Sequence, residues 1–326
     1  MASKASNFLR LVFAVALTAY LLYKSHPRAV AAALAGVSWR WIGLAVLLVF
    51  VDRALMAVRW IWLLAPVDRR VRPSTAELMR IFFVSTFVGS FLPASVGSDA
   101  VRTWQVTQRG MPSAQALASV LMDRVLGIAS ILIAATGGLI LVPSLMHNHR
   151  VMVAFYASAA GCIVALLFVF SARWDTLVRQ RIVPRLPGKA RSIAERLLTA
   201  LQAYQAHHST TLVVLAASVG VQVLRIVQAW CLGMSLGMSA PLAAYFANIP
   251  IILLLMLLPI TVSGLGVAQW AFTWLFVPVG AVALEPVVFA LSVLFLALGI
   301  LGNLPGAFLF LTSPRTGPLR GSASAK

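Results

Sequence analysis

The chain has 326 residues, of which 61% are hydrophobic and only 10% are charged. Soluble domains carry about 25% charged residues, so this composition excludes a soluble globular protein and indicates an integral membrane protein. The net charge is +18, and the basic residues lie in short segments between apolar runs instead of on one polar face. We therefore expect contact with the membrane surface and no nucleic-acid partner.

Apolar runs predict the membrane segments. The first run, 8–23, has some features of a signal peptide, but Lys24 and Arg28 follow it, so we expect a retained helix. A spanning helix needs about 20 residues, and the runs therefore predict an all-α polytopic helical bundle with about 7–9 membrane segments in a single domain, 1–326. The runs are 8–23, 41–64, 81–97, 114–142, 151–171, 210–236, 243–260, 265–281 and 286–312.

Basic loops set the orientation, because cytoplasmic loops carry an excess of Lys and Arg. The longest polar segment, 172–209, is rich in arginine, so we place it in the cytoplasm. Its apolar residues recur at helical spacing over 189–205, which predicts an amphipathic helix lying on the membrane. The basic segments 65–80 and 99–113 are then also inside, and so are both termini, including a disordered tail, 313–326.

The run 81–97 lies between two cytoplasmic segments, so it must enter and leave the membrane on the same side. We predict a re-entrant segment here, broken at Pro93 and Gly97. The stretch that starts at Leu92 reads LPASVGSDAVRTW, and a second stretch, starting 166 residues later at Leu258, reads LPITVSGLGVAQW. Five of the thirteen positions are identical.

The second stretch comes out in the opposite orientation when the loop charges are followed along the chain. We therefore predict two inverted repeats, about 81–236 and 243–312, each with a Pro/Gly-broken re-entrant segment. Such pairs indicate a substrate site between the repeats in secondary transporters. The alternative is a pair of kinked, packed helices without a role in transport.

Charged side chains within the apolar runs are the candidate site, because a charge near the bilayer centre costs about 2.5–3.5 kcal/mol. Asp99 and Arg102 are one helical turn apart: either they pair at a helix end, or Arg102 and the helix start receive an anionic headgroup. Interhelical ion pairs are the alternative for the other charges. Basic residues exceed acidic ones at depth, which favours an anionic ligand. The candidates are Pro93, Gly97, Ser98, Asp99, Arg102, Arg59, Asp123, Arg124, Gln222, Arg225, Gly264, Gly266 and Gln269.

Signals of catalysis are weak. The pair His147 and His149 has no Cys or acidic residue nearby, and neither a nucleophile elbow nor a phosphate-binding glycine loop occurs. We therefore expect no metal, no cofactor and no catalytic residue. If the protein were a membrane transferase, its base would have to be Asp99 or Asp123.

These motifs resemble the flippase-like transmembrane region of lysylphosphatidylglycerol synthases. The chain departs from the family pattern at Gln269, where a Glu is usual, and we expect no aminoacyl transfer, because the soluble domain of the full synthases is lacking. The resemblance is carried by Leu92-Pro93 through Gly97-Ser98-Asp99 to Arg102, by Asp123-Arg124 through Gly127, by Pro259 through Gly264-Leu265-Gly266-Val267, and by Leu304-Pro305-Gly306.

The resemblance implies lipid handling without naming the lipid. Together with the excess of basic residues at depth, it predicts a bacterial inner-membrane protein that binds and translocates an anionic phospholipid or a lipid-linked phosphate. Two alternatives stay open: a membrane transferase acting on polyprenyl-linked or hopanoid lipids, and a non-catalytic partner of such an enzyme. A homodimer is compatible with each of them.

Overall fold

The computed structural model describes Tyr20, Tyr23 and residues 26–64, 66–68, 70–90, 96–147, 149–257, 266–277 and 285–312. Over these residues the chain forms helices and turns, without a strand. Four of the described segments are long and apolar enough to cross a membrane: α3 (Trp39–Leu63), α6 (Ser113–Leu141), α10 (His208–Ser235) and Glu285–Leu311. The predicted all-α polytopic membrane protein is therefore confirmed.

Each predicted apolar run after the first coincides with a described helix, whereas the run 8–23 lies almost wholly outside the described residues. The total of about 7–9 membrane segments stays a prediction. The segment Glu285–Leu311 divides into α13 (Glu285–Leu301) and α14 (Leu304–Leu311). The remaining helices are α2 (Pro27–Ala35), α4 (Thr75–Ser90), α5 (Val96–Thr107), α7 (His149–Phe170), α8 (Ala172–Leu177), α9 (Gly188–Gln202), α11 (Leu242–Met256) and α12 (Val267–Phe276).

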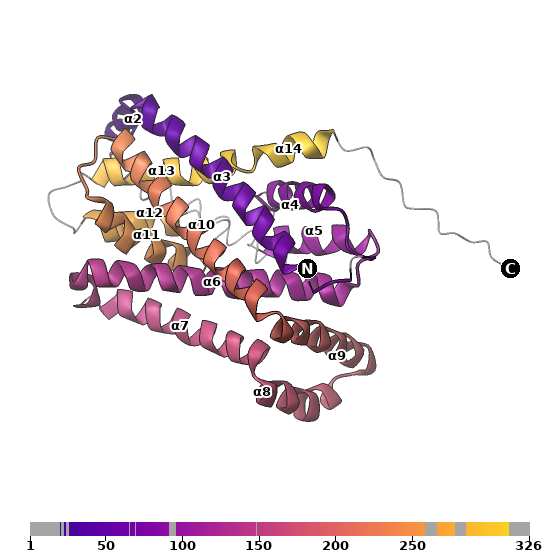
Figure 1. Cartoon of the computed structure of the whole chain (residues 1–326). Helices are drawn as coiled ribbons and strands as arrows, with labels where there is room; N and C mark the ends of the chain where they lie inside the picture. The colour runs from indigo at the N-terminus through magenta and orange to yellow at the C-terminus, as the bar shows by residue number, and fades with distance from the viewer. Residues whose placement is uncertain are drawn as a thin grey trace.

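Helices α3 and α10 lie side by side and antiparallel at the centre of the bundle (Figure 1). At one end of the pair, the Ser38 amide donates to the Ser235 carbonyl over 2.9 Å. At the other end, the Tyr204 hydroxyl donates to the Leu63 carbonyl over 2.8 Å. Burial raises the pKa of the Tyr204 hydroxyl, so this donor stays protonated at neutral pH.

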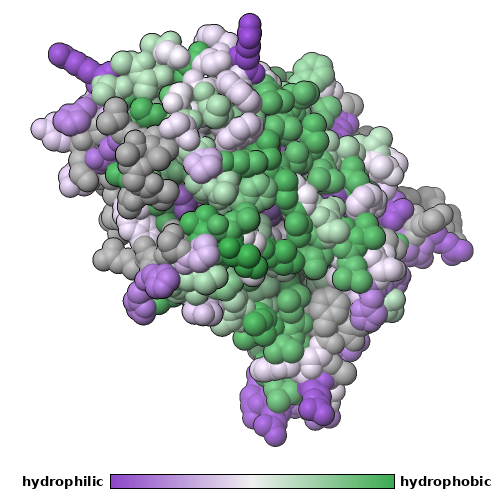
Figure 2. All heavy atoms as spheres, turned by 60° about the vertical axis from the view of Figure 1, so that its left-hand side comes forward, coloured by the Kyte–Doolittle hydropathy of each residue, from purple (hydrophilic) through white to green (hydrophobic). Residues whose placement is uncertain are grey.

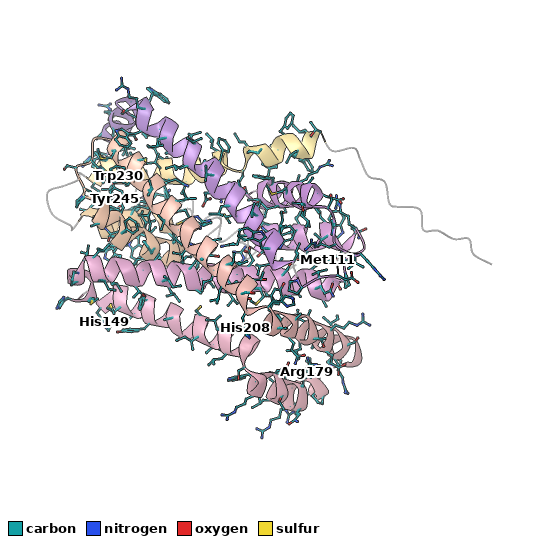
Figure 3. The ribbon with its side chains drawn as sticks, in the orientation of Figure 1. Met111, His149, Arg179, His208, Trp230 and Tyr245 are labelled. Carbon is teal, nitrogen blue, oxygen red and sulfur yellow. The ribbon has the colours of Figure 1, made fainter. Side chains whose placement is uncertain are left out.

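The two ends of the bundle differ in charge. The arginine-rich segments 65–80 and 172–209 lie at the end where α3 stops and α10 starts, which we call the basic end. The segment 236–241 at the opposite end has no charged residue. Met111 and His149 mark the two ends in Figure 3.

Two helix pairs flank the central helices. The pair α4 and α5 joins the rest of the chain at the basic end, and the pair α11 and α12 joins it at the opposite end (Figure 1). Helix α4 has 16 residues and α12 has 10, which gives lengths of about 24 Å and about 15 Å. Both are shorter than the hydrocarbon core of about 30 Å. These lengths suit the predicted re-entrant segments, which stay a prediction.

Glycines connect the two predicted repeats. Gly138 on α6 lies directly against the backbone of Phe246 and Ala247 on α11, and Gly306 on α14 lies against the backbone of Phe83 on α4. At both places an added Cβ atom would overlap a backbone carbonyl. The long helical segment that follows each helix pair therefore packs against the first helix of the other pair.

The predicted amphipathic helix in the basic segment is present as α9, and most of its apolar stripe packs on the protein, whereas Ile193 is 61% exposed. Leu198, Leu201 and Tyr204 are buried, and the last two pack against Leu63 and residues of α6 and α10. An apolar stripe alone does not show whether lipid or protein covers it. Here the end of the bundle provides an apolar surface that covers most of the stripe. A lipid-facing surface lies elsewhere: Figure 2 shows hydrophobic residues over much of one face, with hydrophilic residues mainly at its margins.

The glycine contact at α6 and α11 predicts a difference between two neighbouring substitutions. Gly138→Ala should lower the midpoint of thermal unfolding in detergent, because overpacking against a backbone costs about 1–3 kcal/mol. Gly137→Ala is the matched control, since an added Cβ atom meets nothing within 4 Å there. Equal midpoints for the two variants would contradict the close approach of the helices.

Candidate functional site

The carboxylate of Asp123 joins four helices. Its Oδ1 atom lies 2.6 Å from Nη2 of Arg59 on α3, and its Oδ2 atom lies 3.3 Å from Nη1 of Arg102 on α5. Arg59 also donates through Nη1 to the hydroxyl of Ser218 on α10 over 2.9 Å. All three charged residues are at least 90% buried. Asp123 thus takes part in the interhelical ion pairs that the sequence left as the alternative to a ligand contact.

Two aromatic rings hold the Arg102 side chain in place. Its Cζ atom lies 4.9 Å from the ring centroid of Trp60 and 4.6 Å from that of Phe82. Trp60 in turn donates through Nε1 to the hydroxyl of Ser119 over 3.4 Å. Cation–π contacts of desolvated arginines are attractive, so the rings fix the guanidinium group while two of its edges stay available for hydrogen bonds.

The second charge of α5, Asp99, pairs with α6 as well. Its Oδ2 atom lies 2.7 Å from Nε of Arg124. The helix pair is thus held by two interhelical ion pairs, Asp99 with Arg124 and Arg102 with Asp123, instead of the pair within one helix that the spacing of Asp99 and Arg102 allows. The reason is the antiparallel packing of α5 on α6, which brings both neighbours of α6 within reach. Counting Arg59, this cluster has three arginines and two aspartates, a net charge of +1.

A second charged cluster lies near the middle of α3. The carboxylate of Asp52 is 1% exposed, and its two oxygen atoms lie 3.4 Å from Arg53 and 3.4 Å from Arg225 on α10. Polar residues continue along α10: Gln222 donates to Ser130 on α6 over 3.0 Å. Gln222 and Gln228 on the same helix are buried, so this polar stripe faces the protein interior.

The second helix pair has no charged residue in its described part. Gln269 accepts a hydrogen bond from the Gly266 amide over 2.6 Å, and Gly266 adopts a φ of 80°, so Gln269 caps the start of α12. In the first pair, Gly97 and Ser98 open α5, and Ser98 touches Gly89 on α4. Two further candidates, Pro93 and Gly264, lie outside the described residues.

A groove of about 720 Å³ opens at the basic end, between α9 and the start of α6. Arg196, Thr199 and Gln115 line it, together with Arg179, which Figure 3 shows between α8 and α9. Arg179 is paired with Asp175 over 2.9 Å. The sequence indicated the positive charge of this segment but not the groove, which needs the packing of α9 on α6.

Several contacts of the site were not expected from the sequence. Ser218 lies one turn before Gln222, so the polar stripe of α10 could have been extended to it. Trp60 and Phe82 have no such signal, because aromatic residues are common in apolar helices. In the described part of the chain, no group of three or more His, Cys, Asp or Glu side chains is placed to hold a metal ion.

The shared carboxylate predicts a large loss of stability on substitution. Asp123→Asn leaves two buried arginines without their counter-charge and should lower the free energy of unfolding by about 3–5 kcal/mol. Glu195→Gln is the control, because Glu195 pairs with Arg191 on the surface, where an ion pair contributes about 0–1 kcal/mol. Reversible unfolding in detergent micelles measures both. If the two losses were equal, Asp123 would not be the residue that joins these helices.

Comparison with known proteins gives one match. A sequence model of the family described as the lysylphosphatidylglycerol synthase TM region matches residues 7–306. No curated protein and no solved structure matches. The match covers most of the chain and includes the motifs around Asp99, Asp123 and Gly266. The chain therefore belongs to this family of lipid-related membrane proteins, the lysylphosphatidylglycerol synthase transmembrane region.

Proposed function

We propose that the protein binds an anionic phospholipid or a lipid-linked phosphate within the membrane and moves its headgroup from one leaflet to the other. The observation that carries this proposal is the buried cluster of Arg59, Arg102 and Asp123, in which two arginines from α3 and α5 share one carboxylate of α6. A buried excess of positive charge is unfavourable unless an anion compensates it. Family membership supports a lipid as the source of that anion.

Arg102 is the residue that would receive the headgroup. Asp123 lies closer to Arg59, at 2.6 Å, than to Arg102, at 3.3 Å, so it can keep Arg59 when Arg102 changes partner. The Nε atom of Arg102 is buried without a hydrogen-bond partner, which leaves a donor for a phosphate oxygen. The start of α5 at Gly97 and Ser98 would add backbone N–H groups to the same anion.

Movement between leaflets would use the two helix pairs. They join the bundle at opposite ends, and in our proposal each is a re-entrant segment of one inverted repeat. The polar side chains of Asp99, Arg124, Gln222 and Arg225 would line the path on the first-repeat side. Gly264, Gly266 and Gln269 would form the uncharged counterpart. The arginine-rich basic end would face the cytoplasm of a bacterial inner membrane, with both termini on that side.

A translocation assay tests this function. Protein reconstituted in liposomes should move a fluorescent phosphatidylglycerol between leaflets faster than a fluorescent phosphatidylcholine. Arg102→Gln should reduce that rate at least about tenfold, because the loss of one hydrogen bond between charged groups is worth about 1.5–3 kcal/mol. Arg191→Gln is the control, since Arg191 lies on the exposed surface of α9.

The thermal midpoint of Arg102→Gln is measured in parallel, so that loss of function is separated from loss of fold. A folded Arg102→Gln variant that translocates phosphatidylglycerol at the rate of the unmodified protein would contradict the assigned role of Arg102. Equal, protein-independent rates for both lipids would contradict the function itself.

A further inference from the structure

The cluster of Asp52, Arg53 and Arg225 is built differently from the one around Asp123. Each arginine lies 3.4 Å from the shared Asp52 carboxylate, whereas the closest contact in the other cluster is 2.6 Å. Charge-assisted hydrogen bonds between Arg and carboxylate normally measure about 2.7–2.9 Å. Asp52 therefore holds two guanidinium groups loosely and satisfies neither of them.

Both guanidinium groups converge on one neutral atom. Nη1 of Arg53 lies 3.4 Å from the sulfur of Met56, and Nη2 of Arg225 lies 3.1 Å from the same sulfur. A thioether is a weak acceptor and does not compensate two positive charges. Two groups of like charge thus face each other across a single sulfur atom, and the three charged residues together have a net charge of +1.

This cluster is only partly closed. The side chains of Arg53 and Arg225 are 14% and 22% exposed, although Arg53 lies near the middle of the membrane-length helix α3. A guanidinium group at that depth avoids hydrocarbon and faces protein, water or a polar ligand. Parts of both side chains are therefore open to water or to a polar ligand.

The break between α13 and α14 lies beside Arg53. Nη2 of Arg53 donates to the carbonyl of Gly299, in the last turn of α13, over 3.2 Å, and the chain resumes as α14 after Asn303. Asn303 donates to Ser90, the last residue of α4, over 2.8 Å. The Oδ1 atom of Asn303 and the Nε atom of Arg53 are buried without hydrogen-bond partners. The break thus lies against Arg53 on one side and against the end of α4 on the other.

We propose that Arg53 and Arg225 form a second anion site, distinct from Arg102, which takes a singly charged phosphodiester. One negative charge neutralises the net charge of the cluster, and two guanidinium groups on either side of Met56 suit the separate oxygen atoms of one phosphate. While no phosphate is bound, the Asp52 carboxylate pairs with both guanidinium groups. The proposal rests on the proposed function in that the phosphodiester is taken to be a lipid headgroup, although a free phosphate has the same chemistry.

Binding of a short-chain lipid to the purified full-length protein tests this site. The probe is dihexanoylphosphatidylglycerol, titrated while the thermal unfolding midpoint is followed, with dihexanoylglycerol as the phosphate-free control. In protein that carries Arg102→Gln, so that the site of the proposed function does not contribute, Arg53→Gln and Arg225→Gln should each weaken binding at least about tenfold, as expected for the loss of a charged hydrogen bond. Arg191→Gln on the surface of α9 should bind as the unmodified protein does.

Asp52→Asn separates an anion site from a structural ion pair. Because Asp52 competes with the phosphate, its neutral replacement should bind the probe severalfold more tightly, and the probe should raise the unfolding midpoint of this variant more than that of the unmodified protein. This outcome does not depend on whether the arginine variants fold. Unchanged or weaker binding by Asp52→Asn would overturn the proposal, and so would normal binding by folded Arg53→Gln and Arg225→Gln.

Two further arms identify the anion and separate this proposal from the function above. Inorganic phosphate that competes with the probe at equal concentration would assign the site to the free anion, and failure to compete would assign it to the lipid. A protein that binds the probe through Arg53 and Arg225 but translocates no lipid would keep this site and overturn the proposed function. If translocation depends on Arg102 while substitutions of Arg53 and Arg225 leave probe binding unchanged, the proposed function is kept and this second site is overturned.

Discussion

The structure depends most on one carboxylate shared by two buried arginines. Asp123 connects Arg59 on α3 with Arg102 on α5, and Ser218 on α10 completes the set. In a membrane the apolar faces of helices do not distinguish strongly between a neighbouring helix and lipid, so packing and polar contacts decide which helices meet. One charged cluster therefore contributes both to the position of the first helix pair and to the packing of the two central helices against each other.

The sequence was sufficient for the helical fold, because hydrocarbon leaves the backbone few alternatives. Runs such as 114–142 and 210–236 coincide with α6 and α10 within two residues, and the charges of α6 were expected to find partners on other helices. The choice of partner could not be predicted. Asp99 and Arg102 have the spacing of a pair within one helix, yet each reaches α6, and that outcome is decided by tertiary packing.

The packing partners of α9 and of the aromatic residues at the site could not be predicted for the same reason. The apolar stripe of α9 follows from periodicity, but a stripe that covers protein and one that covers lipid have the same pattern. Leu201 lies against the bundle because the adjoining ends of α3 and α6 leave an apolar surface there. Trp60 and Phe82 contact Arg102 from two different helices, and in the sequence they resemble the other apolar residues around them.

The glycine contacts have a consequence for the order in which the protein is completed. Helix α4 packs on α14 through Gly306, and α14 is the last described helix of the chain. During synthesis the first helix pair must therefore wait, without this neighbour, until α14 has been made. Before α14 is made, the backbone around Phe83 lacks the neighbour that covers it, so an early helix acquires its permanent surroundings only when a segment more than 200 residues later along the chain has been inserted.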